Sequence, residues 1–275
     1  MKAGLRSARL FCFCRRQQNS NIVGGWMNLE RVFVGIDDTD NLESRGTGWL
    51  SRQLGKNICV EFSGVRLQGV TRHQLLVHPD IPYTSHNSSA CLDLLFEDGL
   101  PDDFFTFVSD FIAGRSASGS DPGICVAFAK WVTKTVQSFG LSAQKEVLTK
   151  GFAAGLAEDE DIFLQELGGT GQGIIGALAA VGLRATGNDG RFIALEGIRK
   201  LEGVVKVSQM LANSGVARVL DETGKDIPED DQVNTFDWVR PGLFDDQPVF
   251  YVAPDPSGKA GMWVPLHGRK QKKEV

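Results

Sequence analysis

VFVGIDDTD, residues 32–40, is an apolar run that ends abruptly in three carboxylates. Residues 32–36 are β-branched, aromatic or small, which is the composition of a short strand buried on both faces. Asp37, Asp38 and Asp40 would lie where that strand meets its loop. We therefore expect a buried strand followed by a functional site.

The three carboxylates predict a cation site. Crowded carboxylates repel one another and raise each other's pKa unless a cation neutralises them. Mg²⁺ carried in by phosphates suits such a cluster, because it binds one or two carboxylates and completes its coordination with water and phosphate oxygens. We predict that Asp37, Asp38 and Asp40 bind Mg²⁺. The alternative is a solvated Asp-rich turn, and the apolar strand before the motif and the Gly-containing stretch after it favour the site.

Composition limits the class of protein. The chain has 275 residues, of which 42% are hydrophobic and 23% charged, as expected for one large or two small globular domains. No apolar run approaches the roughly 18 residues of a membrane span, so we expect no membrane partner. The five cysteines include no C-x-x-C pair, which argues against a zinc ribbon or a disulfide framework. A reducing, cytoplasmic location is the expectation.

The two ends of the chain differ from its body. Residues 1–26 contain five basic residues and no acidic one, and we interpret them as a disordered extension or a mis-assigned start. The tail, residues 268–275, is also basic. The chain carries −5 overall; since the extension carries +5 and the tail +3, residues 27–267 carry −13. A body with this negative charge repels a phosphate backbone, and we therefore expect nucleic acid to be disfavoured as a partner. A homodimer remains an open alternative.

A turn and a helix are expected after the acidic loop. Residues 41–48 are rich in turn formers, and apolar residues follow at helical spacing over residues 49–60. A helix start after such a loop offers free main-chain N–H groups and the positive end of the helix dipole to an anion. Thr47 would place a hydroxyl near that anion, and the alternative is that Thr47 caps the helix.

A hairpin with a polar loop is expected over residues 66–96. Residues 65–77 and 90–96 have strand composition, and the ten-residue loop at residues 80–89 is crowded with hydrogen-bonding side chains, which suggests a ligand loop. A rigid turn made by Pro79 and Pro82 is the alternative. The predicted substrate contacts are Tyr83, Ser85, His86, Asn87 and Ser88.

The second informative stretch is LGGTGQGIIGALAAVG, residues 167–182. Its glycines place bare main-chain amides beside the start of an Ala/Leu-rich helix, an arrangement that binds phosphates. The stretch lacks the Gly-Lys-Ser/Thr ending of a Walker A loop and the Rossmann spacing. We predict phosphate contacts at Gly171, Gln172 and Gly173, with a tight helix-packing turn as the alternative.

The remaining pattern predicts a mixed α/β chain. Helices are expected near residues 102–113, 131–139 and 145–156, and strands at 192–195 and 204–207. The Pro- and Gly-dotted end is typical of short strands and loops. We expect residues 27–200 to form a nucleotide- and metal-binding α/β core and residues 201–267 to form a smaller α+β part.

Three stretches together resemble one family, the archaeal tRNA-isoleucine 2-agmatinylcytidine synthetases. They are GIDDTD (residues 35–40) with Arg45 and Gly46 after it, PDIPY (residues 79–83) and GQGIIGALAAVG (residues 171–182). The resemblance covers roughly residues 30–200. It implies an α/β (α+β) fold, with a kinase-like catalytic domain joined to a ferredoxin-like domain. It also implies that ATP with Mg²⁺ activates a cytosine carbonyl before agmatine attacks.

The resemblance assigns roles to individual residues. Asp37, Asp38 and Asp40 would bind Mg²⁺–ATP, with Thr47 in the catalytic loop. The residues that would contact the nucleotide are Thr39, Arg45, Gly46, Gly171, Gln172 and Gly173.

Two departures limit the resemblance. The OB-fold and cysteine zinc ribbon of the family have no counterpart in this sequence. Thr84, His86 and Asn87 stand where a Lys, an Arg and a Gly are expected.

We therefore predict a Mg²⁺-dependent, ATP-using enzyme that transfers a phosphoryl group to a small molecule or activates it. Catalysis would rest on charge neutralisation and positioning. Two alternatives remain open: a non-catalytic protein that binds a nucleotide or small molecule, and a tRNA cytidine-modifying enzyme that acts with a partner.

Overall fold

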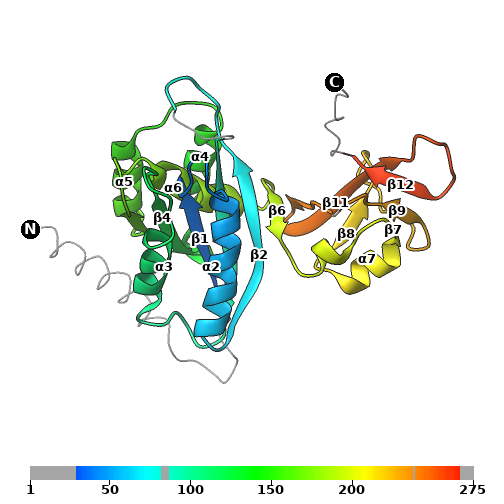
Figure 1. Ribbon diagram of the computed structural model, residues 1–275, viewed down its shortest axis with the longest axis horizontal. Helices are drawn as coiled ribbons and strands as arrows, with labels where there is room; N and C mark the ends of the chain where they lie inside the picture. The colour runs from blue at the N-terminus through cyan, green and yellow to red at the C-terminus, as the bar shows by residue number, and fades with distance from the viewer. Residues whose placement is uncertain (1–28, 82–86, 238, 267–275) are drawn as a thin grey trace, which may run out of the picture. The chain divides into compact units, whose positions relative to one another are not determined.

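The computed structural model describes residues 29–81, 87–237 and 239–266. It contains two compact units, divided between Thr186 and Gly187 (Figure 1). This division precedes the expected boundary at residue 200, because residues 191–194 form a strand that pairs with Gly242 of the second unit. Both units combine helices and strands, which confirms the predicted mixed α/β class.

An antiparallel sheet with β1 at its centre organises the first unit. β1 pairs with β3 on one side and β4 on the other, β2 adds to β3, and β5 adds to β4. The strands are β1 (Glu30–Asp37), β2 (Val65–Gln74), β3 (Ser88–Phe96), β4 (Gly123–Phe128) and β5 (Phe163–Glu166). The central place of β1 confirms the strand predicted at residues 32–36, all of which are buried.

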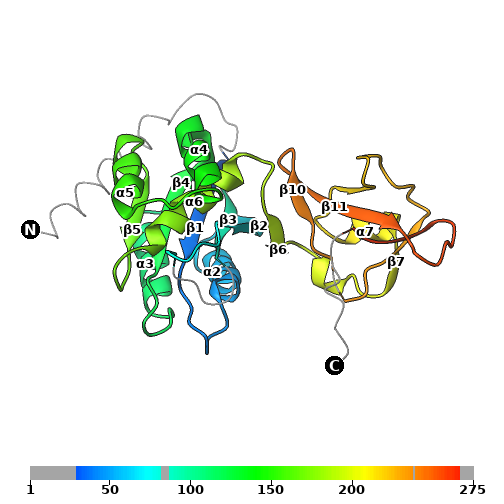
Figure 2. The same ribbon diagram turned by 90° about the horizontal axis from the view of Figure 1, so that it is seen from above.

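Helices cover both faces of this sheet (Figure 2). They are α2 (Thr47–Glu61), α3 (Phe104–Ala113), α4 (Lys134–Ala143), α5 (Lys150–Asp159) and α6 (Gly173–Ala185), with a short 3-10 turn at Ala129–Trp131. α2 and α3 cover one face, where the ring of Phe104 lies 5.2 Å from that of Phe96 and 5.7 Å from that of Phe62. The other three helices cover the opposite face.

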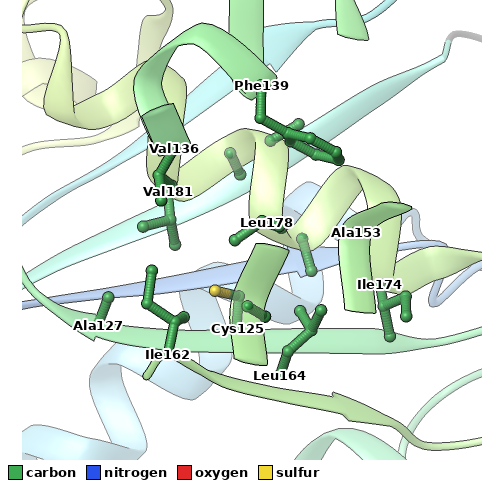
Figure 3. Close-up of a cluster of buried hydrophobic side chains, with 14 of the residues drawn as sticks. Cys125, Ala127, Val136, Phe139, Ala153, Ile162, Leu164, Ile174, Leu178 and Val181 are labelled. Atoms are coloured by element: carbon green, nitrogen blue, oxygen red, sulfur yellow. The ribbon is translucent and has the colours of Figure 1, made fainter. Parts of the chain in front are cut away.

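α6 lies directly against the sheet. A Cβ on Gly35 of β1 would lie 2.0 Å from the carbonyl oxygen of Ala177, and a Cβ on Gly123 of β4 would lie 2.3 Å from the main chain of Gly173. Only glycine on both strands permits this approach. Figure 3 shows the resulting core, in which apolar side chains of α6 pack with those of α4, α5, β4 and β5.

A buried ion network joins α6 to the sheet at its other end. Arg184 of α6 donates from Nη2 to Oδ2 of Asp93 on β3 at 2.6 Å. Arg31 of β1 donates to both oxygens of the same carboxylate, at 2.9 and 2.7 Å. The side chains of Arg184 and Asp93 are only 2% and 3% exposed. Such a charge inside the protein requires these partners.

The second unit consists of short strands around β11. Its elements are β6 (Arg191–Ala194), a 3-10 turn (Ile198–Lys200), β7 (Val204–Lys206), α7 (Val207–Asn213), β8 (Arg218–Leu220), β9 (Gln232–Asn234), β10 (Gly242–Phe244), β11 (Gln247–Pro254) and β12 (Met262–Pro265). β11 pairs with β8, β10 and β12. The core includes Met210, Val233 and Phe250.

One predicted strand of this unit is present but one residue shorter than expected. The strand expected over residues 204–207 ends at Lys206, and α7 begins at Val207. The side-chain oxygen of Gln209 accepts the main-chain N–H of Lys206 and so completes the start of the helix.

Among the residues that the structure describes, no helix has both the length and the apolar character that crossing a bilayer requires.

Candidate functional site

Antiparallel pairing brings four loop segments to one edge of the first sheet. Asp37, at the end of β1, pairs with Gly123 at the start of β4, and Gly123 also pairs with Glu166 at the end of β5. Ile36 pairs with Ala90 near the start of β3. The acidic loop, the turn before β4, the Gly-rich turn and the polar hairpin loop therefore all leave the sheet at the same edge.

Asp37 lies against the first turns of α6. A Cβ on Gly176 would lie 1.7 Å from Oδ2 of Asp37, so only glycine on the helix leaves room for this carboxyl group. The pKa of Asp37 is raised from 3.8 to about 7. Burial is the largest cause, and the charges of Asp38 and Asp40 also raise it. A carboxyl group in this state gains or loses a proton close to neutral pH.

Asp38 turns the chain sharply and links it to a neighbouring segment. Its φ of 51° lies in the left-handed region, which an aspartate tolerates better than most residues. Its carboxylate accepts the main-chain N–H of Asp121. Burial raises the pKa of Asp38, and so do the charges of Asp121 and Asp40, although this hydrogen bond lowers it.

Thr47 positions the acidic loop through its hydroxyl group. It donates to Oδ1 of Asp40 at 2.8 Å, and it accepts the main-chain N–H of Thr39 at 3.2 Å and the hydroxyl of Thr39 at 3.0 Å. Both threonines are buried. The alternative that Thr47 caps the helix does not hold, because α2 begins at Thr47 and its N-cap residue is Gly46.

Arg45 and Gly46 shape the turn before α2. The guanidinium carbon of Arg45 lies 5.2 Å from the ring centre of Trp49, and the Arg45 side chain is exposed. Gly46 has a φ of 81°, which favours glycine. Both residues neighbour the acidic loop, and their contact with a nucleotide stays a prediction.

The amides predicted to bind phosphates already have a partner, the carboxylate of Asp121. Oδ1 of Asp121 accepts the N–H of Gly171 at 3.0 Å, and Oδ2 accepts the N–H of Gln172 at 3.5 Å. Thr170 donates both its N–H and its hydroxyl to the same carboxylate. The N–H of Gly173 donates to the main-chain oxygen of Asp121 at 3.1 Å. In this conformation the Gly-rich turn binds an anion from its own chain.

Sequence reasoning missed Asp121. It lies in the Gly/Ser-rich segment before β4, where an Asp-Pro pair is an ordinary turn signal. Its partners follow about fifty residues later, so no local spacing reveals them. The available hint was indirect: a turn rich in bare amides requires an anion.

The hairpin loop is described only at its edge. The side chain of Asn87 donates to the carbonyl of Leu76 at 2.6 Å, and the hydroxyl of Ser88 accepts from Nε of Arg72 at 2.8 Å. Both residues therefore stabilise the base of the hairpin. The other predicted substrate contacts, Tyr83, Ser85 and His86, lie outside the described residues.

The carboxylates of the acidic loop do not form a metal cage by themselves. Within residues 29–81, 87–237 and 239–266, no group of three or more His, Cys, Asp or Glu side chains is arranged to bind a metal ion. Mg²⁺ fits such a site only when phosphate oxygens and water complete its shell, which is its usual mode of binding. Burial is the main cause of the raised pKa of both Asp37 and Asp38, and neighbouring carboxylates raise both further.

Comparison with known proteins finds relatives over somewhat more than half of the chain. An uncharacterized protein of Methanocaldococcus jannaschii is 28% identical over 160 residues, 56% of this chain and 50% of the relative. The 2-agmatinylcytidine synthetase TiaS of Pyrobaculum neutrophilum, named for an isoleucine tRNA, is 28% identical over 155 residues, 55% of this chain and 35% of the relative. This chain thus spans half or less of each curated relative. No protein-family model matches it.

Solved structures of TiaS are also similar. The crystal structure of TiaS in complex with its isoleucine tRNA and ATP has 27% identity and a TM-score of 0.48, and the match covers 56% of this chain and 36% of that chain. The resemblance to 2-agmatinylcytidine synthetases that the motifs indicate is confirmed by sequence over about half of the chain.

One prediction is wrong. A small-molecule substrate with nucleic acid disfavoured does not agree with a relative that is named for a tRNA. The physical reason is that a net charge averages over the whole body, whereas a nucleic-acid site needs only a local surface, so −13 over residues 27–267 excludes no such site.

Proposed function

We propose that residues 30–186 form the catalytic core of an ATP-using enzyme that modifies RNA, with tRNA as the substrate class. The observation that carries the proposal is the meeting of the acidic loop and the start of α6 at one sheet edge, with Asp37 against Gly176. The sequence similarity to a synthetase named for a tRNA extends over 155 residues, 55% of this chain, and supports the substrate class.

In this proposal Asp37 and Asp38 bind Mg²⁺–ATP at the end of β1. The bound nucleotide would supply the activating group for an oxygen of the acceptor. The chain's own residues set the geometry: Thr47 orients Asp40 through a 2.8 Å hydrogen bond, and α6 directs its positive end towards the acidic loop. Arg45, Gly46 and the hairpin loop are proposed to contact the nucleotide and the acceptor.

Asp37 is suited to a second task. With a pKa of about 7, its carboxyl group can exchange a proton with a reacting group at neutral pH. A bound cation would lower that pKa and leave the carboxylate charged. We therefore propose that Asp37 binds the cation in the loaded state and is partly protonated without it.

A nucleotide assay tests this function. The purified protein is incubated with Mg²⁺, ATP and total tRNA, and ADP and AMP are separated chromatographically. We expect consumption of ATP that tRNA increases and that D37N and D38N abolish. The matched control is D221N in the second unit, where the carboxylate binds only its own turn.

Two results would reject the proposal. ATP that binds in calorimetry without being consumed, with or without tRNA, indicates a non-catalytic nucleotide-binding protein. Consumption that persists in both D37N and D38N places the reaction elsewhere in the chain.

A further inference from the structure

Asp121 connects two segments of the first unit that are far apart in sequence, the acidic loop and the Gly-rich turn. Its carboxylate accepts hydrogen bonds from Thr170, Gly171 and Gln172 of the Gly-rich turn. Its main-chain N–H donates to the carboxylate of Asp38. One residue thus touches both the acidic loop and the Gly-rich turn.

The Gly-rich turn is shaped around this carboxylate. A Cβ on Gly169 would lie 1.8 Å from Oδ1 of Asp121, and a Cβ on Gly171 would lie 2.2 Å from Oε2 of Glu166. Both glycines also have positive φ, 56° and 79°. Lys150 closes the outer side, since its ammonium group donates to the carbonyl of Thr170 at 2.7 Å and to Glu166.

The segment before Asp121 is attached to the acidic loop as well. The N–H of Ala117 donates to the carbonyl of Thr39 at 2.9 Å, and the side chain of Asn41 donates to the carbonyl of Ser118 at 3.2 Å. Residues 117–121 therefore form a bridge between the loop after β1 and the turn before α6. Movement of Asp121 would shift both.

We propose that Asp121 is the positioning residue of this site. Its carboxylate fixes the Gly-rich turn, its main chain fixes Asp38, and neither group contacts the nucleotide. This inference deepens the proposed function and rests on it. It changes the roles expected of Gly171 and Gln172: their amides serve Asp121, and the phosphates are bound through the acidic loop and its cation.

The proposal predicts the sign of an effect. If Asp121 merely fills a phosphate site, its removal frees amides and lowers the KM for ATP. If Asp121 positions Asp38 and the turn, its removal raises that KM and lowers kcat. We expect D121A to raise the KM for ATP about tenfold, an effect of the size of a lost charged hydrogen bond.

Three variants and two measurements test the inference. D121A removes the side chain, D121N keeps its shape without the charge, and D221A is the control in the second unit. Hydrogen exchange followed by mass spectrometry reports on the amides of Thr170, Gly171 and Gln172, and steady-state kinetics reports KM and kcat. We expect exchange in D121A to be about tenfold faster at these amides, D121N to be intermediate in both measurements, and D221A to match the wild type.

The outcomes separate this inference from the proposed function. A wild-type protein that consumes no ATP rejects the function, and the exchange rates in D121A still decide whether Asp121 fixes the turn. In an active protein, an unchanged or lowered KM for ATP in D121A overturns the inference, and so does unchanged exchange at residues 170–172. If D121A fails to fold, as circular dichroism would show, D121N decides by the same criteria.

Discussion

Each unit contains an aspartate whose carboxylate accepts the N–H and the hydroxyl of a threonine and a further main-chain N–H. In the first unit Asp121 binds Thr170 and Gly171. In the second unit Asp221 binds Thr223 at 2.8 and 2.6 Å and the N–H of Lys225 at 3.0 Å. The donor groups are nearly the same in the two units. The partners of Asp221 lie at most four residues away in sequence, whereas those of Asp121 lie about fifty residues away.

The difference shows what a hydrogen-bonded carboxylate can do. Asp221 shapes its own turn, as Asx turns do throughout proteins. Asp121 fixes the relation between two loops that no local interaction could join. Hydrogen bonds lower the pKa of both carboxyl groups: those from Thr170, Gly171 and Gln172 outweigh the effect of burial on Asp121, and those from Thr223 and Lys225 act on Asp221.

A second pair of residues repeats the contrast. Arg31 binds both oxygens of Asp93 at 2.9 and 2.7 Å in the first unit, and Arg218 binds both oxygens of Asp226 at the same distances in the second. Asp93 is buried and has a second partner in Arg184, whereas Asp226 is exposed. The two ion pairs therefore have the same hydrogen-bond distances but differ in burial.

The largest expected effect comes from breaking the buried member of this pair. D93A leaves Arg184 charged and buried without its carboxylate, so the free energy of unfolding should fall by about 3–5 kcal/mol. Urea denaturation measures the loss. D226A, the control, should leave the midpoint unchanged, because exposed ion pairs contribute little. Equal midpoints for D93A and the wild type would show that burial does not distinguish the two pairs.

The next effect is a dependence on pH that Asp37 brings to the first unit. Its pKa is about 7 in the folded protein and near 3.8 in an exposed chain, so the folded state binds the proton more tightly. Stability from this group is present below about pH 4 and is lost as the pH rises towards 7, by up to about 4 kcal/mol. Thermal unfolding of the wild type and D37N without divalent cations, between pH 4 and 8, measures it.

D37N supplies the control for that experiment. Because asparagine does not titrate, the part of the pH dependence due to Asp37 should vanish, and D37N should be more stable than the wild type at pH 8. Parallel curves for the two proteins would contradict the raised pKa.

A smaller effect separates Asp121 from Asp221. D121A removes charged hydrogen bonds between distant segments and should lower the free energy of unfolding by about 1–2 kcal/mol, after allowance for solvent screening at a partly exposed group. D221A should produce no measurable change, because its turn is exposed and local. Equal losses for the two variants, measured by urea denaturation, would remove the distinction between them.

The smallest expected effect concerns the hydroxyl that orients Asp40. T47V keeps the shape of the side chain but removes hydrogen bonds to Asp40 and Thr39, which should cost about 1 kcal/mol. T47S restores the hydroxyl and should restore stability. T223V, which loses one exposed hydrogen bond to Asp221, is the matched control. A T47V protein as stable as T47S would show that this network does not stabilise the loop.

Much of the fold follows from local patterns. The apolar run at residues 32–36 became the central strand, and the helical spacing after residue 48 became α2. The Ala/Leu-rich run became α6, which begins at Gly173. These predictions held because burial on two faces and helical periodicity are visible within ten or fifteen neighbouring residues.

The arrangement of the candidate site was harder to predict from the sequence. The glycines at 171 and 173 indicated an anion, but a pattern of amides cannot say whether that anion is a ligand or a side chain of the same protein. The end of the strand at Lys206 also depended on a side-chain contact from Gln209. Both cases were decided by a specific partner rather than by composition.

The sequence by itself determined that three carboxylates follow a buried strand and that bare amides precede an apolar helix. Only the tertiary structure placed these two features at one edge of a sheet, with Asp121 between them. The physical reason is that strand and helix formation depend on neighbours in the chain, whereas the register of β1 with β4 and the close approach of Gly176 to Asp37 arise when the whole sheet packs against α6.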